Sequence, residues 1–182
     1  MKNKLQNYGF LLGIAGFVVV LDQWSKVFVR QHLALGERWS PWEWLAPYAR
    51  IVYWKNTGAA FGIGQDLGLV FMILAIAVVV LILFYYPQIP REDWFLKTAM
   101  GMQLGGAIGN LLSRIMDGFV TDFISVGNFA VFNVADSFIS IGAVILVLGV
   151  WFSEKRTKEL EKQHEFENTE DAIRAGGENA GE

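Results

Sequence analysis

Two aspartates, Asp122 and Asp136, are the side chains of this sequence that are best suited to do chemistry. Both are framed by apolar residues, and Gly127-Asn128 between them is typical of a turn. A carboxylate at membrane depth costs roughly a few kcal/mol, so it usually faces a cavity and has a function. Two carboxylates that a turn brings together share one proton and titrate as a unit. One can then take a proton from water while the other protonates or polarises a carbonyl, as in an aspartic protease.

Two other interpretations of this aspartate pair stay open. The carboxylates could be unrelated residues at helix ends, one of them capping a helix N-terminus. They could also serve a proton- or ion-coupled small membrane transporter, because such proteins use intramembrane aspartates. Four predicted helices without an internal repeat suit a transporter less well than an enzyme.

Other kinds of catalytic centre are disfavoured by what the sequence lacks. It has no cysteine, and its two histidines, His32 and His164, suggest no Ser-His or Cys-His arrangement. No His-Glu-x-x-His or similar metal-binding spacing is present. We therefore expect neither a metal nor another cofactor.

The composition predicts a membrane protein with a polar tail. The 182 residues are 53% hydrophobic, and several apolar runs approach the length of a membrane span. Residues 1–152 carry ten Lys/Arg and nine Asp/Glu, whereas residues 153–182 carry five and nine. No basic patch suggests a nucleic acid partner. We expect one membrane-embedded domain over residues 1–152 and a charged, largely disordered tail over residues 153–182.

Four transmembrane helices are predicted, at residues 8–29, 67–86, 94–114 and 133–152. The segments 30–66 and 115–132 would then lie on one side of the membrane, and both termini on the other. The distribution of Lys and Arg favours the cytoplasm for the termini only slightly. A cleaved signal peptide is disfavoured because the first apolar run is long and no small-x-small site precedes Asp22.

Small residues predict where helices pack closely. Gly101, Gly105 and Gly109 recur every four residues in the third predicted helix, which indicates tight packing against a neighbour. Gly9 and Gly13 in the first helix carry the same expectation.

The segment 30–66 combines many aromatic side chains with polar ones, which is typical of a membrane–water interface. Residues 48–55 within it are rich in strand-forming residues, so we predict a strand there.

Five short motifs make the sequence resemble one family closely. In chain order they are Asp22-Gln-x-Ser-Lys26, Asn56-Thr-Gly58-Ala-Ala-Phe61-Gly62, Gly109-Asn110-Leu111-x-x-Arg114, Gly118-x-Val120-x-Asp122-Phe123 and Phe132-Asn133-x-Ala135-Asp136-Ser137. The same order is found in lipoprotein signal peptidases (signal peptidase II), and the resemblance covers about residues 8–152.

The resemblance implies an aspartic endopeptidase of the bacterial inner membrane. Such an enzyme cuts prolipoproteins just N-terminal to a diacylglyceryl-modified cysteine, so lipidated precursors and membrane lipids are the implied partners. The implied fold class is all-α, with four transmembrane helices, a small extracytoplasmic β-cradle and an interfacial helix. The active site would lie near the extracytoplasmic face. The oligomeric state stays open, with a monomer expected.

The resemblance also assigns roles to site residues. Asp122 and Asp136 match the catalytic aspartates. The residues that match positions expected to orient the substrate backbone or the aspartates, or otherwise to support the site, are Asp22, Lys26, Asn56, Gly58, Asn110, Arg114, Asn133 and Ala135.

Three of these assignments have alternatives. Asp22 and Lys26, four residues apart, could form only a structural salt bridge. Arg114 could instead snorkel to the membrane interface. Many family members have Asp where this chain has Ser113, so Arg114 is expected to lack a partner there. Asp117 could supply one, or Arg114 could turn entirely to the substrate.

Overall fold

The structure is a computed structural model that describes residues 2–58, 67–90, 92–152, 154–155 and 163, with side chains from Tyr8 onward. The chain divides into two units, Met1–Leu146 and Val147–Glu182. All residues of the candidate site lie in the first unit. The expected disorder of the tail concerns residues that lie almost entirely outside the described ranges.

Four long helices make up most of the described chain. They are α1 (Lys2–His32), α2 (Gly68–Tyr85), α3 (Trp94–Asp117) and an unlabelled helix at Val134–Phe152, which we call the C-terminal helix. The sequence predicted all four helices. Their bounds agree with the predicted spans within a few residues, except that α1 begins well before residue 8. By length and apolar composition, three segments of the described chain could cross a membrane: Tyr8–His32, Gly68–Gln88 and Val134–Phe152.

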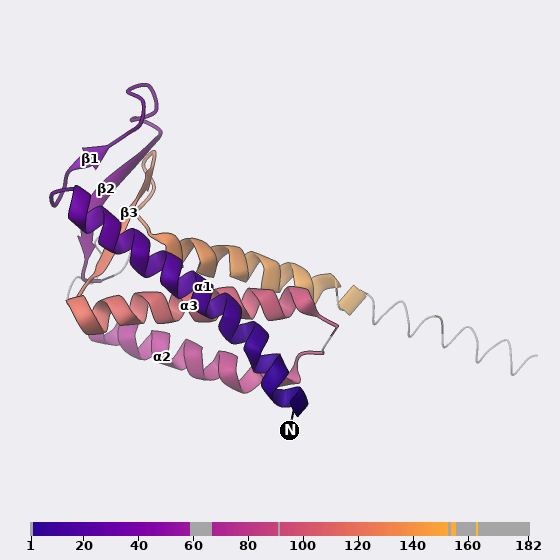
Figure 1. Cartoon of the computed structure of the whole chain (residues 1–182). Coiled ribbons are helices and arrows are strands. Elements are labelled where there is room, and N and C mark those ends of the chain that lie inside the picture. The colour runs from indigo at the N-terminus through magenta and orange to yellow at the C-terminus, as the bar shows by residue number, and fades with distance from the viewer. Residues whose placement is uncertain (1, 59–66, 91, 153, 156–162, 164–182) are drawn as a thin grey trace, which may run out of the picture. The chain divides into compact units, whose positions relative to one another are not determined.

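The remaining helix, α3, is more polar because it lies at the centre of the helical unit. Eleven of its residues are buried, whereas only Ile82 is buried in α2. A central helix contacts other parts of the protein on most sides, so its polar side chains are kept away from lipid. Figure 1 shows α3 between α1, α2 and the C-terminal helix.

Glycines bring α3 unusually close to α1. A Cβ on Gly105 would lie 2.6 Å from the Cβ of Val18 and 2.7 Å from the backbone oxygen of Ala15. Gly101 and Gly109 face Ile14 and Asp22 in the same way. The predicted tight packing of the α3 glycines is thus confirmed.

The same expectation for the first helix is wrong. No described atom lies within 4 Å of where a Cβ on Gly9 or Gly13 would be. The face that α1 turns toward α3 instead presents Ile14, Val18 and Asp22, whose spacing of four residues fits the glycine row of α3.

A small antiparallel sheet stands at one end of the helices. Its strands are β1 (Arg38–Trp39), β2 (Ala49–Asn56) and β3 (Val120–Val126), in the order β1-β2-β3. The predicted strand at residues 48–55 corresponds to β2. In Figure 1 the sheet lies beside the end of α1 and extends away from the helices. Residues 33–58 contain no helix, and part of the segment expected to hold an interfacial helix, residues 59–66, lies outside the described residues.

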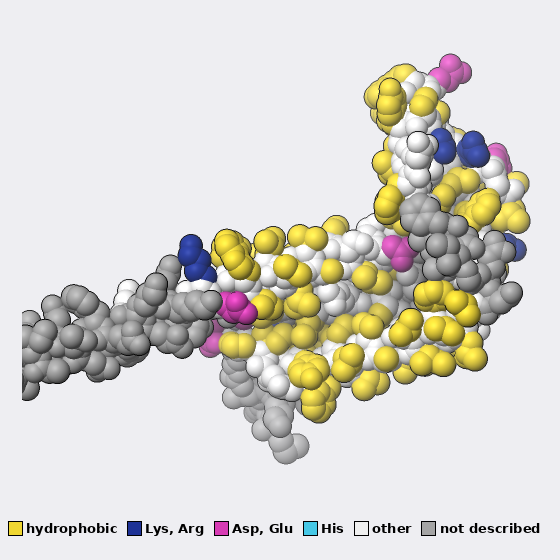
Figure 2. Space-filling model, turned by 180° about the vertical axis from the view of Figure 1, so that it is seen from behind, with side chains coloured by type: hydrophobic (Ala, Val, Ile, Leu, Met, Phe, Trp, Pro, Cys, Tyr) yellow, Lys and Arg dark blue, Asp and Glu magenta, His cyan; other side chains and the backbone are white. Residues whose placement is uncertain are grey.

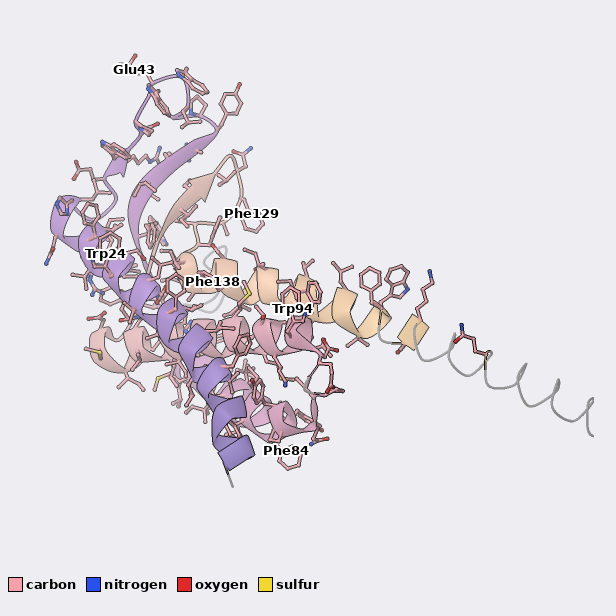
Figure 3. The ribbon with its side chains drawn as sticks, turned by 45° about the vertical axis from the view of Figure 1, so that its right-hand side comes forward. Trp24, Glu43, Phe84, Trp94, Phe129 and Phe138 are labelled. Atoms are coloured by element: carbon pink, nitrogen blue, oxygen red, sulfur yellow. The ribbon has the colours of Figure 1, made fainter. Side chains whose placement is uncertain are left out.

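The helical surface is strongly apolar, as expected for contact with lipid. Figure 2 shows hydrophobic side chains over much of the visible helical face. Trp24, Phe84 and Trp94 point outward from three helices and are more than half exposed (Figure 3). The chain therefore places apolar side chains outside as well as inside its helical unit, which is typical of a membrane protein.

The glycine row makes a prediction about stability. Gly105→Ala adds a methyl group where the backbone of α1 already lies, so we expect it to reduce the free energy of unfolding by about 1–3 kcal/mol. Gly13→Ala is the matched control, because it gains the same helix propensity in open space and should be neutral or stabilising by up to about 1 kcal/mol. Thermal unfolding in detergent measures both, and an equal rise in Tm for the two variants would contradict the packing.

Candidate active site

Asp136 lies in the first turn of the C-terminal helix and takes part in its N-terminal cap. The backbone N–H of Asp136 donates to Asn133 Oδ1 (3.1 Å), and the backbone N–H of Asn133 donates to Asp136 Oδ2 (3.1 Å). This reciprocal pair is a capping box built from Asn and Asp. The helix-cap interpretation is therefore correct for one oxygen of Asp136. Its other oxygen, Oδ1, accepts a hydrogen bond from Asn110 Nδ2 at 2.7 Å.

Asp122 occupies the middle of β3, where its neighbours hold both carboxylate oxygens. Asn133 Nδ2 donates to Oδ1 (2.7 Å), and Asn56 Nδ2 on β2 donates to Oδ2 (2.8 Å). The residue is only 2% exposed. Burial, together with the nearby charge of Asp136, raises the pKa of Asp122 to about 6, although the two amide donors act in the opposite direction.

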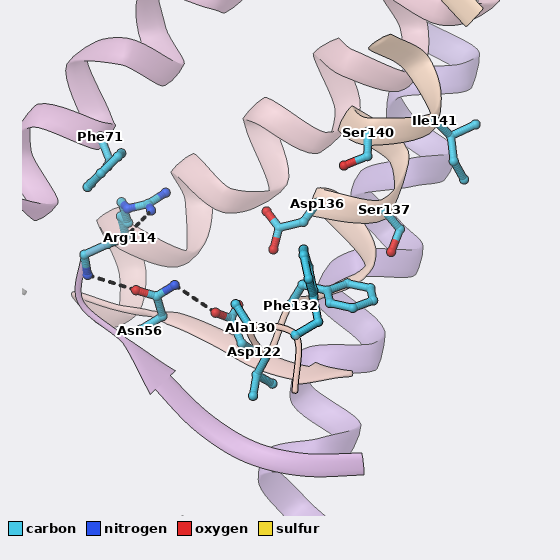
Figure 4. A pocket seen from close by; sticks show the side chains of 13 residues that line it. Asn56, Phe71, Arg114, Asp122, Ala130, Phe132, Asp136, Ser137, Ser140 and Ile141 are labelled. Carbon is cyan, nitrogen blue, oxygen red and sulfur yellow. Dashed lines mark hydrogen bonds between the residues drawn. The ribbon is translucent and has the colours of Figure 1, made fainter. Parts of the chain in front are cut away.

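The two aspartates belong to one hydrogen-bonded cluster. Asn133 contacts both, because its side chain donates to Asp122 while its backbone donates to Asp136. Asn133 Nδ2 also lies 3.2 Å from Asn110 Oδ1, so the two amides are themselves joined. In Figure 4 the carboxyl groups of Asp122 and Asp136 face the same pocket. The cluster thus brings together residues from β2, β3, α3 and the start of the C-terminal helix.

A buried ion pair lies directly behind this cluster. Lys26 Nζ donates to Asp22 Oδ2 (2.7 Å), Asn110 Oδ1 (2.8 Å) and Ser113 Oγ (3.1 Å), so each of its three protons has a partner. Asp22 and Lys26 are both 0% exposed. The other oxygen of Asp22 accepts the backbone N–H of Ala135 at 3.0 Å. The predicted salt bridge is present, and the same aspartate also holds the N-terminus of the helix that carries Asp136.

The pocket has a volume of about 570 Å³ and is part polar, part apolar. Asn56, Gly58, Arg114 and Ser137 join the two aspartates on its wall, and Phe71, Phe132 and Ile141 supply apolar surface. Figure 4 shows these side chains from close by. A peptide flanked by apolar groups would suit such a lining better than a small polar solute.

The side chain of Arg114 lines this pocket. Its guanidinium lies 5.5 Å from the centre of the Phe71 ring, and Nη2 is 3.5 Å from the backbone oxygen of Gly58. Nε is buried and has no hydrogen-bond partner within the described part of the chain. Gly58, in turn, donates its backbone N–H to Asn56 Oδ1 at 2.9 Å, which closes a tight turn.

Arg114 forms no salt bridge within the described residues, as expected, but Asp117 is not its partner and Ser113 is not the reason. Asp117 pairs with Arg30 at the ends of α3 and α1, so it is not the partner of Arg114. Ser113 faces Lys26 rather than Arg114, because neighbouring residues of a helix point about 100° apart. An acidic residue at position 113 would therefore meet the ammonium of Lys26.

Sequence reasoning missed Gln23 and the role of Ser113. Gln23 Nε2 lies within hydrogen-bond distance of Asp22 Oδ2 (3.0 Å), the backbone oxygen of Gly109 (2.9 Å) and Ser113 Oγ (3.2 Å). The helical period was the available signal, since Ser113 follows Gly109 by four residues on the row that faces α1. In the described ranges, no three His, Asp or Glu side chains converge so as to hold a metal ion.

Comparison with known proteins identifies the family. The family model described as signal peptidase (SPase) II matches residues 14–152. Lipoprotein signal peptidases from three bacteria are similar over most of their length. They are those of Caldanaerobacter subterraneus (39% identical, covering 73% of this chain and 90% of the relative), Halalkalibacterium halodurans (36%, covering 80% and 94%) and Streptococcus pneumoniae (33%, covering 73% and 86%).

Two solved structures resemble the fold, both described as a bacterial membrane enzyme studied by the in meso method. The one at 2.3 Å resolution has a TM-score of 0.74 and 26% identity, covering 81% of this chain and 91% of the other. The one at 1.9 Å resolution has a TM-score of 0.70 and 27% identity, covering 78% and 92%. Family model, relatives and fold agree: this chain belongs to the signal peptidase II family, the lipoprotein signal peptidases of bacterial membranes.

Proposed function

We propose that this chain is a membrane aspartic endopeptidase that cuts bacterial prolipoproteins just N-terminal to a diacylglyceryl-modified cysteine. Membership of the signal peptidase II family supports cleavage of prolipoprotein signal peptides as the activity. The observation that carries the aspartic mechanism is the pair Asp122 and Asp136, two carboxyls on the wall of one pocket that share Asn133 as a donor.

In the proposed reaction the pair holds one proton. The ionised carboxyl takes a proton from water, whose oxygen bonds to the scissile carbonyl carbon, while the protonated carboxyl gives its proton to the carbonyl oxygen. The resulting gem-diol then returns a proton to the second carboxylate as its C–N bond breaks. The first carboxyl protonates the leaving nitrogen. The products are a carboxylic acid and an amine, and the pair ends with the single proton with which it began.

The charges around the pocket support a singly protonated pair. Two cations, Lys26 and Arg114, and three carboxylates, Asp22, Asp122 and Asp136, lie in or directly behind it. One proton on the pair makes this set neutral, whereas full ionisation leaves an uncompensated negative charge in a poorly solvated place. Because such a charge is costly to bury, the neutral set is favoured.

The pocket lining suggests how a lipidated substrate binds. We propose that the apolar signal helix enters from the bilayer and that the acyl chains stay against the apolar helical surfaces. Phe71 and Ile141 supply apolar contacts close to the aspartates, and Asn56 and Arg114 would orient the peptide at the polar end. Each buried methylene contributes about 0.8 kcal/mol at most, so two long chains would add several kcal/mol to binding.

We also propose that all four long helices cross the membrane. The 24 residues of α3 extend about 36 Å at ~1.5 Å per residue, which is long enough for a span, and its central position accounts for its polar residues. Both termini and the tail, residues 153–182, would then be cytoplasmic. The sheet and the aspartates would lie near the extracytoplasmic face, where exported precursors arrive.

Removing either carboxyl should abolish cleavage. Asp122→Asn and Asp136→Asn keep the shape of the side chain but cannot transfer the proton, so we expect kcat to fall by at least about 1,000-fold while the protein stays folded. Asp117→Asn is the control, because that carboxylate pairs with Arg30 at a partly exposed position outside the pocket. Cleavage of a lipidated precursor by purified protein measures all three, and wild-type rates in either pocket variant would overturn the assignment.

Lipid on the substrate should decide whether it is cut. We expect efficient processing of a diacylglyceryl-modified precursor and almost none of the same precursor with an unmodified cysteine.

Arg114→Ala should lower kcat/KM about tenfold or more with the aspartates intact, through loss of substrate positioning. A gel-shift assay in liposomes follows both. Equal cleavage of the two precursors would exclude lipid anchoring, and cleavage of neither would favour the transporter interpretation.

The orientation of the chain can be tested with a C-terminal tag. Protease added to intact spheroplasts should leave the tag in place, because the proposed tail is cytoplasmic. A tag on the inner side should be digested only after the membrane is made permeable. Rapid loss from intact spheroplasts would reverse the orientation and place the aspartates on the wrong side for exported substrates.

A further inference from the structure

We infer that Asp122 holds the shared proton, that Asp136 is the ionised member that activates water, and that Lys26 maintains this division as a positioning residue through Asn110. This inference rests on the proposed function and assigns the two carboxyls their separate parts. It is carried by the direction of the hydrogen bonds, the burial of the two residues and their places in the fold.

Lys26 fixes which way the amide of Asn110 points. An ammonium group can only donate, so the atom of Asn110 that lies 2.8 Å from Lys26 Nζ must be the oxygen. The amide nitrogen is then directed at Asp136 Oδ1, 2.7 Å away. Reversing this amide would set N–H groups against the Lys26 ammonium and an oxygen against the carboxylate. Lys26 does not line the pocket, yet it determines what Asp136 receives there.

The amide of Asn133 is fixed in a similar way. A backbone N–H also only donates, so the hydrogen bond from the N–H of Asp136 requires the oxygen of Asn133 on that side. Its nitrogen then faces Asp122 Oδ1 and Asn110 Oδ1. Both amides therefore present N–H groups to carboxylates, and neither orientation depends on the protonation state of Asp122.

The donors to Asp136 favour a negative charge more strongly than those to Asp122. Asp136 accepts a backbone N–H in the first turn of a helix, where the helix dipole favours anions. Its second donor, Asn110, is polarised by the Lys26 ammonium, which strengthens the hydrogen bond. Asp122 lies on a strand, which has little dipole. Its two oxygens accept hydrogen bonds from the side-chain amides of Asn56 and Asn133. Within the described residues, no cation donates a hydrogen bond to either of these amides.

Solvation acts in the same direction. Asp122 is 2% exposed, whereas Asp136 is only half-buried and faces the pocket. Burial penalises the charged form, so the less exposed carboxyl is the better place for the proton.

The other charged groups near the pair do not change this order. Asp22 on α1 opposes a charge on Asp136, but Lys26 on the same helix neutralises it at 2.7 Å. The charges of Arg114 and Lys26 act on both carboxyls, so what distinguishes Asp136 is its hydrogen bond from Asn110, which Lys26 orients. Helix α2, which supplies Phe71 to the pocket, carries no charged residue between Gly68 and Tyr85. The asymmetry therefore comes from the donors and from burial.

Infrared spectroscopy can test where the proton resides without any substrate. Asp136→Asn leaves Asp122 as the one carboxyl of the pair, and Asp122→Asn leaves Asp136, so each variant has lost one neighbouring carboxyl. We expect the protonated-carboxyl band of the first variant to persist at least about one pH unit higher than that of the second. The opposite order, or the same midpoint in both, would overturn the inference.

A second comparison tests the part played by Lys26. The double change Asp22→Asn with Lys26→Met removes a neutral ion pair and keeps an oxygen for the Ala135 N–H. Added to each single-aspartate variant, it should move the midpoint of Asp136 upward and change that of Asp122 much less. Equal shifts or none would show that Lys26 is merely structural.

Two controls keep the outcomes separate. Circular dichroism and Tm verify folding, and if the Lys26 variants do not fold, the first comparison alone decides where the proton resides. These measurements use no precursor, so failure of the wild-type protein to cut lipidated precursor would reject the proposed function and not the proton placement.

Discussion

The structure depends on one constraint: a carboxylate removed from water needs a donor at each oxygen. Asp22 and Asp122 are buried and Asp136 is half-buried, and each of their six oxygens accepts a hydrogen bond. The donors come from α1, β2, α3 and the start of the C-terminal helix. The aspartate pair is therefore complete only when all these elements are in place, so the site and the tertiary fold form together.

Close packing of α1 on α3 follows from the same constraint. Lys26 reaches Asn110 and Ser113 only because the helices approach closely, and glycines on α3 allow that approach. A Cβ at Gly109 would lie 2.7 Å from Asp22 Oδ2 and would displace the carboxylate. The glycine row thus supports the polar cluster as well as the contact between the helices.

The sequence predicted most elements because long apolar runs and a stretch of strand-forming residues mark them directly. The interpretation that one aspartate caps a helix N-terminus holds for Asp136, and spacing indicated the Asp22–Lys26 pair. Contacts between distant elements were not predictable in this way. Nothing local shows that Asp117 meets Arg30, or that α1 turns Ile14 rather than Gly13 toward α3. The expected pairing of position 113 with Arg114 was avoidable from the sequence alone, because neighbouring residues of a helix point in different directions.

Arg114 contrasts with the rest of the polar cluster, and that contrast supports the proposed role of Arg114 in orienting substrate. Lys26 has a partner for every proton, whereas within the described residues Arg114 has two hydrogen bonds, both at 3.5 Å, and a buried Nε without a partner. A guanidinium half-buried beside Phe71 gains from any oxygen that enters the pocket. A peptide carbonyl of a bound precursor would supply that oxygen next to the aspartates. The network behind the pocket is closed and fixes the carboxyls, while the open hydrogen-bonding capacity lies on the pocket side, where a substrate can complete it.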